Sequence, residues 1–221
     1  MTTEKFDLDY APALESTAVV NIAKQYGLFV NGEFVKARGD KTFATINPAT
    51  EAHLANVAEA SKADVNKAVK AARHAYETYW RDMPGKQRAR YLYRIARQLQ
   101  ERAREFAVLE TLDGGKPITE SRDFDLPQAA AHFFYHAGWA DKLDYAFPGR
   151  KVTSHGVGGQ ITPWNFPMMM AAWKLAPALA TGNTVVFKPA ETTPLTALLL
   201  AEVLQDVDLP PGVVNIVTGA G

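Results

Sequence analysis

The chain has 221 residues, which is long enough to bury a substantial core in one or two domains. Its 24 basic and 24 acidic side chains cancel, so no charge excess points to nucleic acid or to an anionic membrane surface. The absence of cysteine excludes disulfides and thiolate metal sites. No apolar run reaches the roughly 20 residues that span a bilayer, and the acidic start lacks a signal-peptide core, so we expect a cytoplasmic protein.

The first predicted elements are an N-terminal extension and a hairpin. Residues 1–26 have mixed polarity and form the extension. Residues 28–36 predict the hairpin, because Asn31 and Gly32 supply the positive φ angles of a two-residue type I′ turn between two β-prone arms. A further strand is expected near residues 54–58.

A helical segment follows the hairpin. Ser61 predicts an N-cap, with the acidic Asp64 in the first turn of the helix that it begins. Apolar residues recur on one side of this helix and predict a buried stripe of Val65, Ala68, Val69, Ala72 and Tyr76. Further helices are expected at residues 86–104, 105–112 and 126–143. The Gly114-Gly115 pair predicts a left-handed cap after the helix at 105–112.

The last of these helices carries aromatic and histidine side chains. Phe133, Phe134 and Trp139 are candidates for the core. His132 and His136 have the i, i+4 spacing of a metal-binding pair, but no third ligand is close in the sequence. We therefore interpret the two histidines as residues of an ordinary helix surface and predict no metal site.

From residue 157 the pattern changes to alternating strands and helices. The expected order is strand, helix, strand, helix, strand, at residues 156–161, 167–181, 184–187, 195–204 and 213–217. Thr193 is predicted as the N-cap of the second helix, with Pro194 at its first position. Crossovers of this length give parallel strands, and the apolar second and third strands indicate a sheet covered on both faces. The predicted fold class is α/β, an incomplete Rossmann-like parallel sheet (β-α-β-α-β) preceded by the helical segment and the hairpin.

Ligands of an open parallel sheet bind beyond the carboxyl ends of its strands, so three loops are expected at one edge. After the second strand, Lys188 and Glu191 can hold the hydroxyls of a ribose, and the Glu191 carboxylate would repel a 2′-phosphate. The alternative is a solvated ion pair. Gly219 and Gly221 either let a ligand approach the backbone or form a turn. Asn165 either donates a hydrogen bond to a developing oxyanion or serves a local turn.

The most specific signal is a set of motifs. Residues 158–221 contain Gln-Ile-Thr-Pro-Trp-Asn-Phe-Pro, Lys-Leu-Ala-Pro-Ala-Leu-Ala-Thr-Gly-Asn-Thr-Val-Val, Lys-Pro-Ala-Glu-Thr-Thr-Pro and Pro-Pro-Gly-Val-Val-Asn-Ile-Val. Upstream lie Val30-Asn-Gly-Glu-Phe, Asn47-Pro-Ala-Thr and Glu110-Thr-Leu-Asp-Gly-Gly-Lys-Pro117. Over residues 27–221 the chain resembles the N-terminal, cofactor-binding portion of the NAD(P)-dependent aldehyde dehydrogenase superfamily.

The resemblance implies functions for particular residues. Asn165 resembles the side-chain half of the oxyanion hole, and Lys174 resembles a lysine near the active site that takes part in proton transfer. The residues expected to bind the cofactor are Ile161, Thr162, Pro163, Trp164, Lys188, Glu191 and Gly221. Those expected to line the aldehyde tunnel are Phe166, Met170 and Trp173. The implied cofactor is NAD, with NADP as an alternative, and the implied assembly is a homo-dimer or tetramer through strands near residues 147–160.

The implied reaction is the oxidation of an aldehyde to a carboxylic acid. In this family a cysteine thiolate attacks the aldehyde, the asparagine holds the oxyanion, hydride passes to NAD, and a glutamate base activates water to hydrolyse the thioester. This chain has no cysteine and ends at Gly221, before the segments that would carry the nucleophile and the base. We therefore expect a fragment of such an oxidoreductase that is inactive alone. The alternatives are a non-catalytic assembly half that pairs with a separately encoded catalytic half, and a degenerate nucleotide-binding protein.

Overall fold

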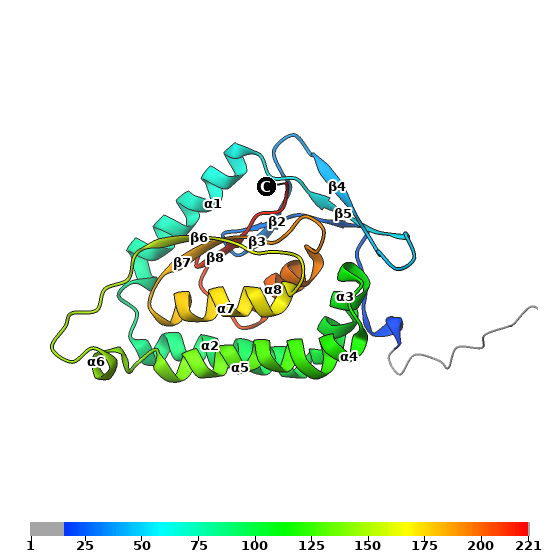
Figure 1. Ribbon diagram of the computed structural model, residues 1–221. Coiled ribbons are helices and arrows are strands. Elements are labelled where there is room, and N and C mark those ends of the chain that lie inside the picture. The colour runs from blue at the N-terminus through cyan, green and yellow to red at the C-terminus, as the bar shows by residue number, and fades with distance from the viewer. Residues whose placement is uncertain (1–15, 221) are drawn as a thin grey trace, which may run out of the picture.

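The computed structural model describes residues 16–220, so most of the predicted N-terminal extension lies outside the described part of the chain. Figure 1 shows a central sheet between helical layers, with a smaller sheet at one end. In spatial order, the strands of the larger sheet are β3 (Glu33–Val35), β2 (Leu28–Val30), β8 (Val214–Ile216), β7 (Thr184–Lys188) and β6 (Val157–Ile161). Those of the smaller sheet are β1 (Gln25–Tyr26), β5 (His53–Ala58) and β4 (Thr42–Ile46).

The predicted β-α-β-α-β unit is confirmed, because β6 pairs in parallel with β7 and β7 with β8. Its two helices, α7 (Pro167–Ala180) and α8 (Leu195–Asp206), cover one face of the sheet, and α1 (Lys62–Ala75) covers the other. Successive side chains of β7 point to opposite faces of the sheet, so they pack against different helices. Val185 and Phe187 join the core on the side of α7, whereas Val186 packs in the cluster that contains α1. The strand is therefore apolar on both sides, as expected for a covered parallel sheet.

A second helical layer lies against α7 (Figure 1). It consists of α2 (Gly85–Glu101), α3 (Ala103–Gly114) and α5 (Leu126–Trp139), with the short helices α4 (Ile118–Glu120) and α6 (Leu143–Ala146) at its ends. Single π-helical turns precede the layer at Tyr76–Trp80 and lead into α5 at Ser121–Asp125, and a 3-10 turn occupies Thr17–Val19. The three predicted helices are thus confirmed. Gly115 has a φ of 70° and forms the predicted left-handed cap of α3.

The predicted hairpin is also confirmed. Asn31 and Gly32 have φ angles of 57° and 82°, as a type I′ turn requires. The sequence does not indicate where the hairpin goes, and the structure places β2 antiparallel to β8, with Phe29 opposite Ile216. The hairpin therefore extends the parallel sheet on its β8 side.

Part of the stripe predicted for α1 is wrong. Ser61 caps the helix as expected, and with Asp64 it forms a reciprocal capping box, but Val65 and Val69 are exposed. The helix instead contacts the sheet through alanines, and Tyr76 is only half-buried. This close packing requires small residues, because a Cβ on Gly212 would lie 2.7 Å from the carbonyl oxygen of Ala71.

Two other predicted positions also differ. Trp139 is not in the core, because it stands at the end of α5 and contacts the ring of Tyr135 at 6.4 Å. Thr193 does not cap α8, and its hydroxyl has no hydrogen-bond partner within residues 16–220. The backbone N–H of Leu195 instead donates to Asp113 Oδ2 at 2.8 Å. A carboxylate from α3 thus replaces the predicted local cap.

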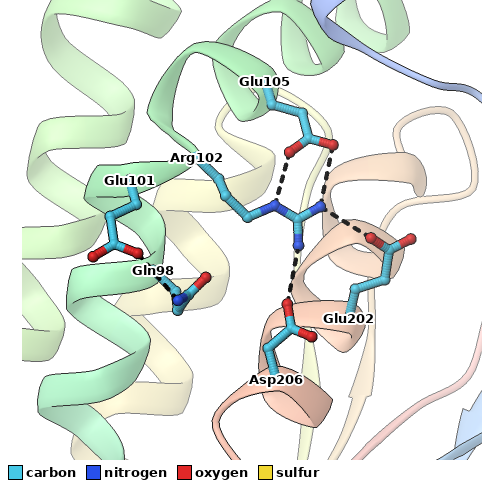
Figure 2. A network of polar contacts seen from close by, with 6 residues as sticks. All are labelled: Gln98, Glu101, Arg102, Glu105, Glu202 and Asp206. Carbon is cyan, nitrogen blue, oxygen red and sulfur yellow. Dashed lines mark hydrogen bonds and ion pairs between the residues drawn. The ribbon is translucent and has the colours of Figure 1, made fainter.

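Arg102, at the junction of α2 and α3, joins this layer to α8 (Figure 2). Its guanidinium binds Glu105 at 2.7 Å, Glu202 at 3.0 Å and Asp206 at 3.6 Å. We refer to these four residues as the Arg102 network. Because Glu202 and Asp206 both belong to α8, the network fixes one end of that helix against the α2–α3 junction.

Candidate functional site

The carboxyl ends of the three parallel strands lie side by side, and backbone hydrogen bonds connect their loops. The N–H of Thr162, just after β6, donates to the carbonyl of Lys188 at 3.1 Å. The N–H of Val217, just after β8, donates to the carbonyl of Phe187 at 2.9 Å. The convergence of strand ends that the sequence predicts is therefore present.

The loop after β6 offers apolar surface at this edge. Ile161, Pro163 and Trp164 are exposed, with Trp164 63% exposed. Thr162 differs from them because it is buried, and its hydroxyl finds no hydrogen-bond partner within the described chain. Three of the four residues predicted to line a cofactor cleft are thus accessible to a ligand.

Asn165 lies at the entrance of α7, with its side chain exposed. Its carbonyl oxygen accepts a hydrogen bond from Lys116 Nζ at 3.2 Å. The same ammonium lies 3.8 Å from the centre of the Phe166 ring. Pro167 then begins the helix, a position where its missing N–H costs nothing. Asn165 therefore stands at the positive end of the helix dipole of α7.

Lys188 and Glu191 form the predicted pair after β7. Lys188 Nζ lies 3.4 Å from Glu191 Oε2 and 3.1 Å from the carbonyl oxygen of Pro189. The pKa of the exposed Glu191 carboxyl is lowered, mainly because the backbone N–H of Glu191 itself donates a hydrogen bond to it. The second cause is the neighbouring Lys188 side chain. The edge therefore presents the Glu191 carboxylate beside the Lys188 side chain, which together form the acceptor and donor set that a ribose diol needs.

Two cavities adjoin these loops. One of about 610 Å³ lies between the smaller sheet and the strand ends, and Trp164 and Glu191 are among the residues that line it. A smaller one of about 200 Å³ lies behind the loop, where Asn165, Glu110 and Lys116 contribute to its wall. Trp164 lines both cavities and stands between them.

The residues predicted to line a tunnel follow one side of α7. Phe166, Met170 and Lys174 are half-buried at four-residue spacing, and Trp173 is exposed and contacts the His132 ring on α5 at 5.5 Å. Lys174 lies roughly 10 Å beyond the start of α7, so the structure does not bring it next to Asn165. Its backbone carbonyl accepts a hydrogen bond from Gln160 at 2.9 Å, which ties α7 to β6.

The glycines after β8 are only partly visible. Gly221 lies outside the described residues. Gly219 has a φ of 147°, which favours glycine at this position whether or not a ligand is near. Its two sequence-based interpretations therefore both stand.

The sequence analysis assigned no function to Glu110 and Asp113, which are buried carboxyl groups on α3. Glu110 Oε2 accepts the N–H of Met168 at 3.1 Å, at the start of α7. Asp113 accepts the N–H of Leu195 at 2.8 Å, at the start of α8, and the hydroxyl of Thr45 at 2.6 Å. Helix α3 thus binds the N-termini of both α7 and α8, the helices that follow β6 and β7.

Burial changes the acidity of both groups. It raises the pKa of Glu110 to about 8, with the charge of Asp125 as the next cause. It also raises the pKa of Asp113 to about 6, against the opposing hydrogen bonds from Thr45 and Leu195. The sequence signal that could have indicated a function for Glu110 and Asp113 is the motif Glu110–Pro117. In it, two acidic residues stand in a largely buried helix just before two glycines.

Two classes of feature are absent from residues 16–220. No helix there is both long enough and apolar enough to cross a membrane. That part of the chain also has no group of three or more His, Asp or Glu side chains placed to hold a metal ion. The rings of His132 and His136 lie 6.1 Å apart on the surface of α5.

Comparisons with known proteins give a consistent result. Residues 34–221 match the family model described as the aldehyde dehydrogenase family. The chain is 49% identical over 205 residues to the mitochondrial aldehyde dehydrogenase of Leishmania tarentolae, covering 89% of this chain and 41% of that protein. It is 48% identical over 208 residues to the human mitochondrial aldehyde dehydrogenase, covering 88% of this chain and 40% of that protein.

Solved structures agree with the sequence relatives. The NAD+ complex of an aldehyde dehydrogenase from Bacillus cereus superposes with a TM-score of 0.84 at 44% identity, covering 90% of this chain and 43% of that one. The chain therefore spans about two fifths of the length of the relatives that it matches. The matched part is their N-terminal portion, and it includes the loops of the candidate site.

Proposed function

Because the chain belongs to the aldehyde dehydrogenase family, we propose that it supplies the oxyanion-hole asparagine and part of the NAD site for oxidation of an aldehyde to a carboxylic acid. The observation that carries this proposal is the convergence of the exposed Asn165 with the Lys188–Glu191 pair at one sheet edge. We propose NAD as the cofactor, with NADP as the alternative.

The cofactor-binding residues fit the group that the family implies. The ionised carboxylate of Glu191 and the ammonium of Lys188 match the two hydroxyls of a ribose, and the carboxylate disfavours a 2′-phosphate. Ile161, Pro163 and Trp164 offer exposed apolar surface for the rest of the ligand, and we assign Thr162 and Gly221 to the same site by family resemblance. NAD, when bound, supplies the hydride acceptor.

Asn165 acts on the substrate in this proposal. Its side-chain amide donates a hydrogen bond to the oxygen of the aldehyde, where negative charge develops when a nucleophile adds to the carbonyl carbon. The N-terminal end of α7 favours the same charge. Phe166, Met170 and Trp173 line the approach of the aldehyde along α7, and Lys174 is assigned to proton transfer by family resemblance.

The nucleophile itself is not in this sequence. The family mechanism forms a thiohemiacetal and a thioester on a cysteine, and these 221 residues contain none. We therefore propose that this chain alone does not oxidise aldehydes and contributes to the reaction only together with residues that carry a cysteine and a general base.

A chimera tests the proposal directly. Residues 27–221 replace the matching segment of the Bacillus cereus relative, and aldehyde-dependent NADH formation is measured with and without Asn165→Ala. We expect an active chimera, and a loss of roughly 10²–10³-fold in kcat for the variant with the KM for NAD unchanged. Glu191→Ala serves as the matched control, because it should raise the KM for NAD and leave kcat nearly intact. An active chimera that is indifferent to Asn165→Ala would refute the assignment.

One observation favours a second candidate, a non-catalytic assembly half. Within residues 16–220, β6 is an edge strand that pairs only with β7, so its other side can accept a further strand. Residues 147–156 form no strand, and β6 pairs with β7 inside the larger sheet. Association of a homo-dimer or tetramer through residues 147–160 is a proposal. The N-terminal extension at residues 1–26 and a cytoplasmic location are proposals as well. Native mass spectrometry from the source decides between the candidates: a complex with a separate cysteine-bearing chain supports the assembly half.

A further inference from the structure

A buried ionic cluster lies directly behind the Asn165 loop. It consists of Glu110 on α3, Lys116 just after α3, and Asp125 at the end of the π-helical turn before α5, and we call it the Lys116 cluster. Glu110 is 1% exposed and Asp125 0%, while the Lys116 side chain is 11% exposed. Charges this deep are stable only when they are paired and hydrogen-bonded, so each contact in the cluster is needed.

Lys116 connects the cluster to the loop. Its ammonium forms an ion pair with Asp125 Oδ2, donates to the carbonyl oxygen of Asn165 at 3.2 Å, and lies 3.8 Å above the Phe166 ring. The three N–H groups of an ammonium are thereby directed to a carboxylate, a carbonyl and an aromatic face. Two of these three contacts fix the residues that lead into α7.

Glu110 fixes the next residues and shares its environment with Asp125. Its Oε2 accepts the N–H of Met168, so the start of α7 is held from a second point. Glu110 Oε1 and Asp125 Oδ1 are both buried and have no hydrogen-bond donor among residues 16–220. The two carboxyl groups lie within hydrogen-bonding reach of each other. Two carboxylates cannot satisfy each other, but a proton on Glu110 lets it donate a hydrogen bond to Asp125.

The charges of the cluster lead to the same conclusion. Two carboxylates and one ammonium carry a net negative charge, whereas one added proton makes the cluster neutral. The burial of Glu110 raises its pKa to about 8, which assigns that proton to Glu110 at neutral pH. Asp125 and Lys116 are the charged groups that act on Glu110, and Met168 adds a backbone N–H.

We propose that Lys116 is a positioning residue for Asn165, and that Glu110 and Asp125 hold Lys116 in place by sharing one proton. The carbonyl contact sets the backbone of Asn165, and therefore the direction in which its amide points into the cleft. The inference rests on the proposed function of Asn165 only for its catalytic consequence, because the positioning itself is a property of this chain.

Hydrogen exchange on the 221-residue chain tests the positioning. Lys116→Met removes the ammonium and keeps the aliphatic stem, and we expect at least about tenfold faster exchange at the amides of Met168 and Met170, with β7 unchanged. Lys116→Arg should restore much of the protection because it keeps a cation. Lys70→Met, at an exposed lysine of α1, is the matched control. Equal protection in Lys116→Met and the control overturns the proposal, and so does a uniform increase that includes β7.

An infrared measurement tests the shared proton independently. At neutral pH we expect the carbonyl stretch of one protonated carboxylic acid, absent in Glu110→Gln, together with unchanged exchange at Met168, because a neutral amide replaces a neutral acid. Absence of that band from the original chain overturns this part of the proposal.

The active chimera adds a catalytic readout. Lys116→Met should lower kcat there with the KM for NAD unchanged. If Asn165→Ala has no effect in the chimera but exchange still responds to Lys116→Met, the proposed function fails and the positioning stands.

Discussion

The Arg102 network and the Lys116 cluster both connect helices, and they differ in how much water reaches them. In the Arg102 network, the arginine side chain is 21% exposed, and those of Glu202 and Asp206 are 43% and 56% exposed. The Lys116 cluster lies behind the strand-end loops and has almost no contact with solvent. The first connects α8 to the α2–α3 junction, and the second fixes the entrance of α7.

Exposure decides what each cluster can do. At the surface, water replaces a lost partner and salt screens the charges, so the Arg102 network tolerates loss. In the interior no such replacement exists, so removal of one charge leaves another unpaired. A buried cluster is therefore costly to alter and holds its neighbours in one geometry, as the proposed positioning of Asn165 requires.

The largest expected difference comes from removing both carboxylates of the buried cluster. In Glu110→Gln/Asp125→Asn, Lys116 keeps no acidic partner, and we expect a loss of about 3–5 kcal/mol in the free energy of unfolding, measured by urea denaturation. The Asp125→Asn single variant should lose less, because Glu110 can ionise and take over as the counter-charge. The double variant should therefore lose more than the sum of the two single variants.

The matched double variant in the Arg102 network is Glu105→Gln/Glu202→Gln. It leaves Asp206 as a partner for Arg102, so the expected loss is about 1 kcal/mol. Equal losses in the two double variants would contradict the importance that we give to burial.

A further difference should appear in the pH dependence of stability. Burial raises the folded pKa of Glu110 from 4.5 to about 8, so the folded chain binds more protons than the unfolded chain between these values. The free energy of unfolding therefore falls as the pH rises from 4.5 to about 8. Asp113 adds the same sign between 3.8 and about 6. Denaturation midpoints measured across this range should fall less steeply in Glu110→Gln, and an unchanged slope would count against the assignment.

The smallest effect is expected for Arg102→Gln. Because two of its partners are well exposed, we expect a loss of about 1 kcal/mol or less at low salt, and a smaller loss at about 1 M salt. The loss in the buried double variant should hardly depend on salt. A salt-independent loss in Arg102→Gln would show that packing of the arginine stem, and not its charge, holds α8.

Local signals predicted much of the fold. The Asn31-Gly32 turn, the Ser61 N-cap and the apolar run of β7 each depend on only a few neighbouring residues, and all three are confirmed. The loop after β6 and the Lys188–Glu191 pair also follow from strand order alone. These features are predictable because their physical cause lies within a short stretch of sequence.

The rest depends on partners far away in the chain. Thr193 is a good local cap, but Asp113 reaches Leu195 from another helix. Val65 satisfies the helical period of α1, yet the face that contacts the sheet is set by the close approach of Gly212. Glu110 looks like an ordinary acidic residue until the burial of Asp125 beside it is known. No periodicity within a helix contains this information.

The place of β8 in the sheet has a consequence for synthesis. β8 lies between the hairpin strand β2 and the parallel strand β7, so the hairpin cannot join the sheet until residues near 216 have left the ribosome. At ordinary translation speeds of about 5–20 residues per second, that interval is roughly 10–40 s. During it the apolar side chains of Leu28–Val30 have no sheet to join, so the hairpin stays unpaired on its β8 side until the end of the described chain is made.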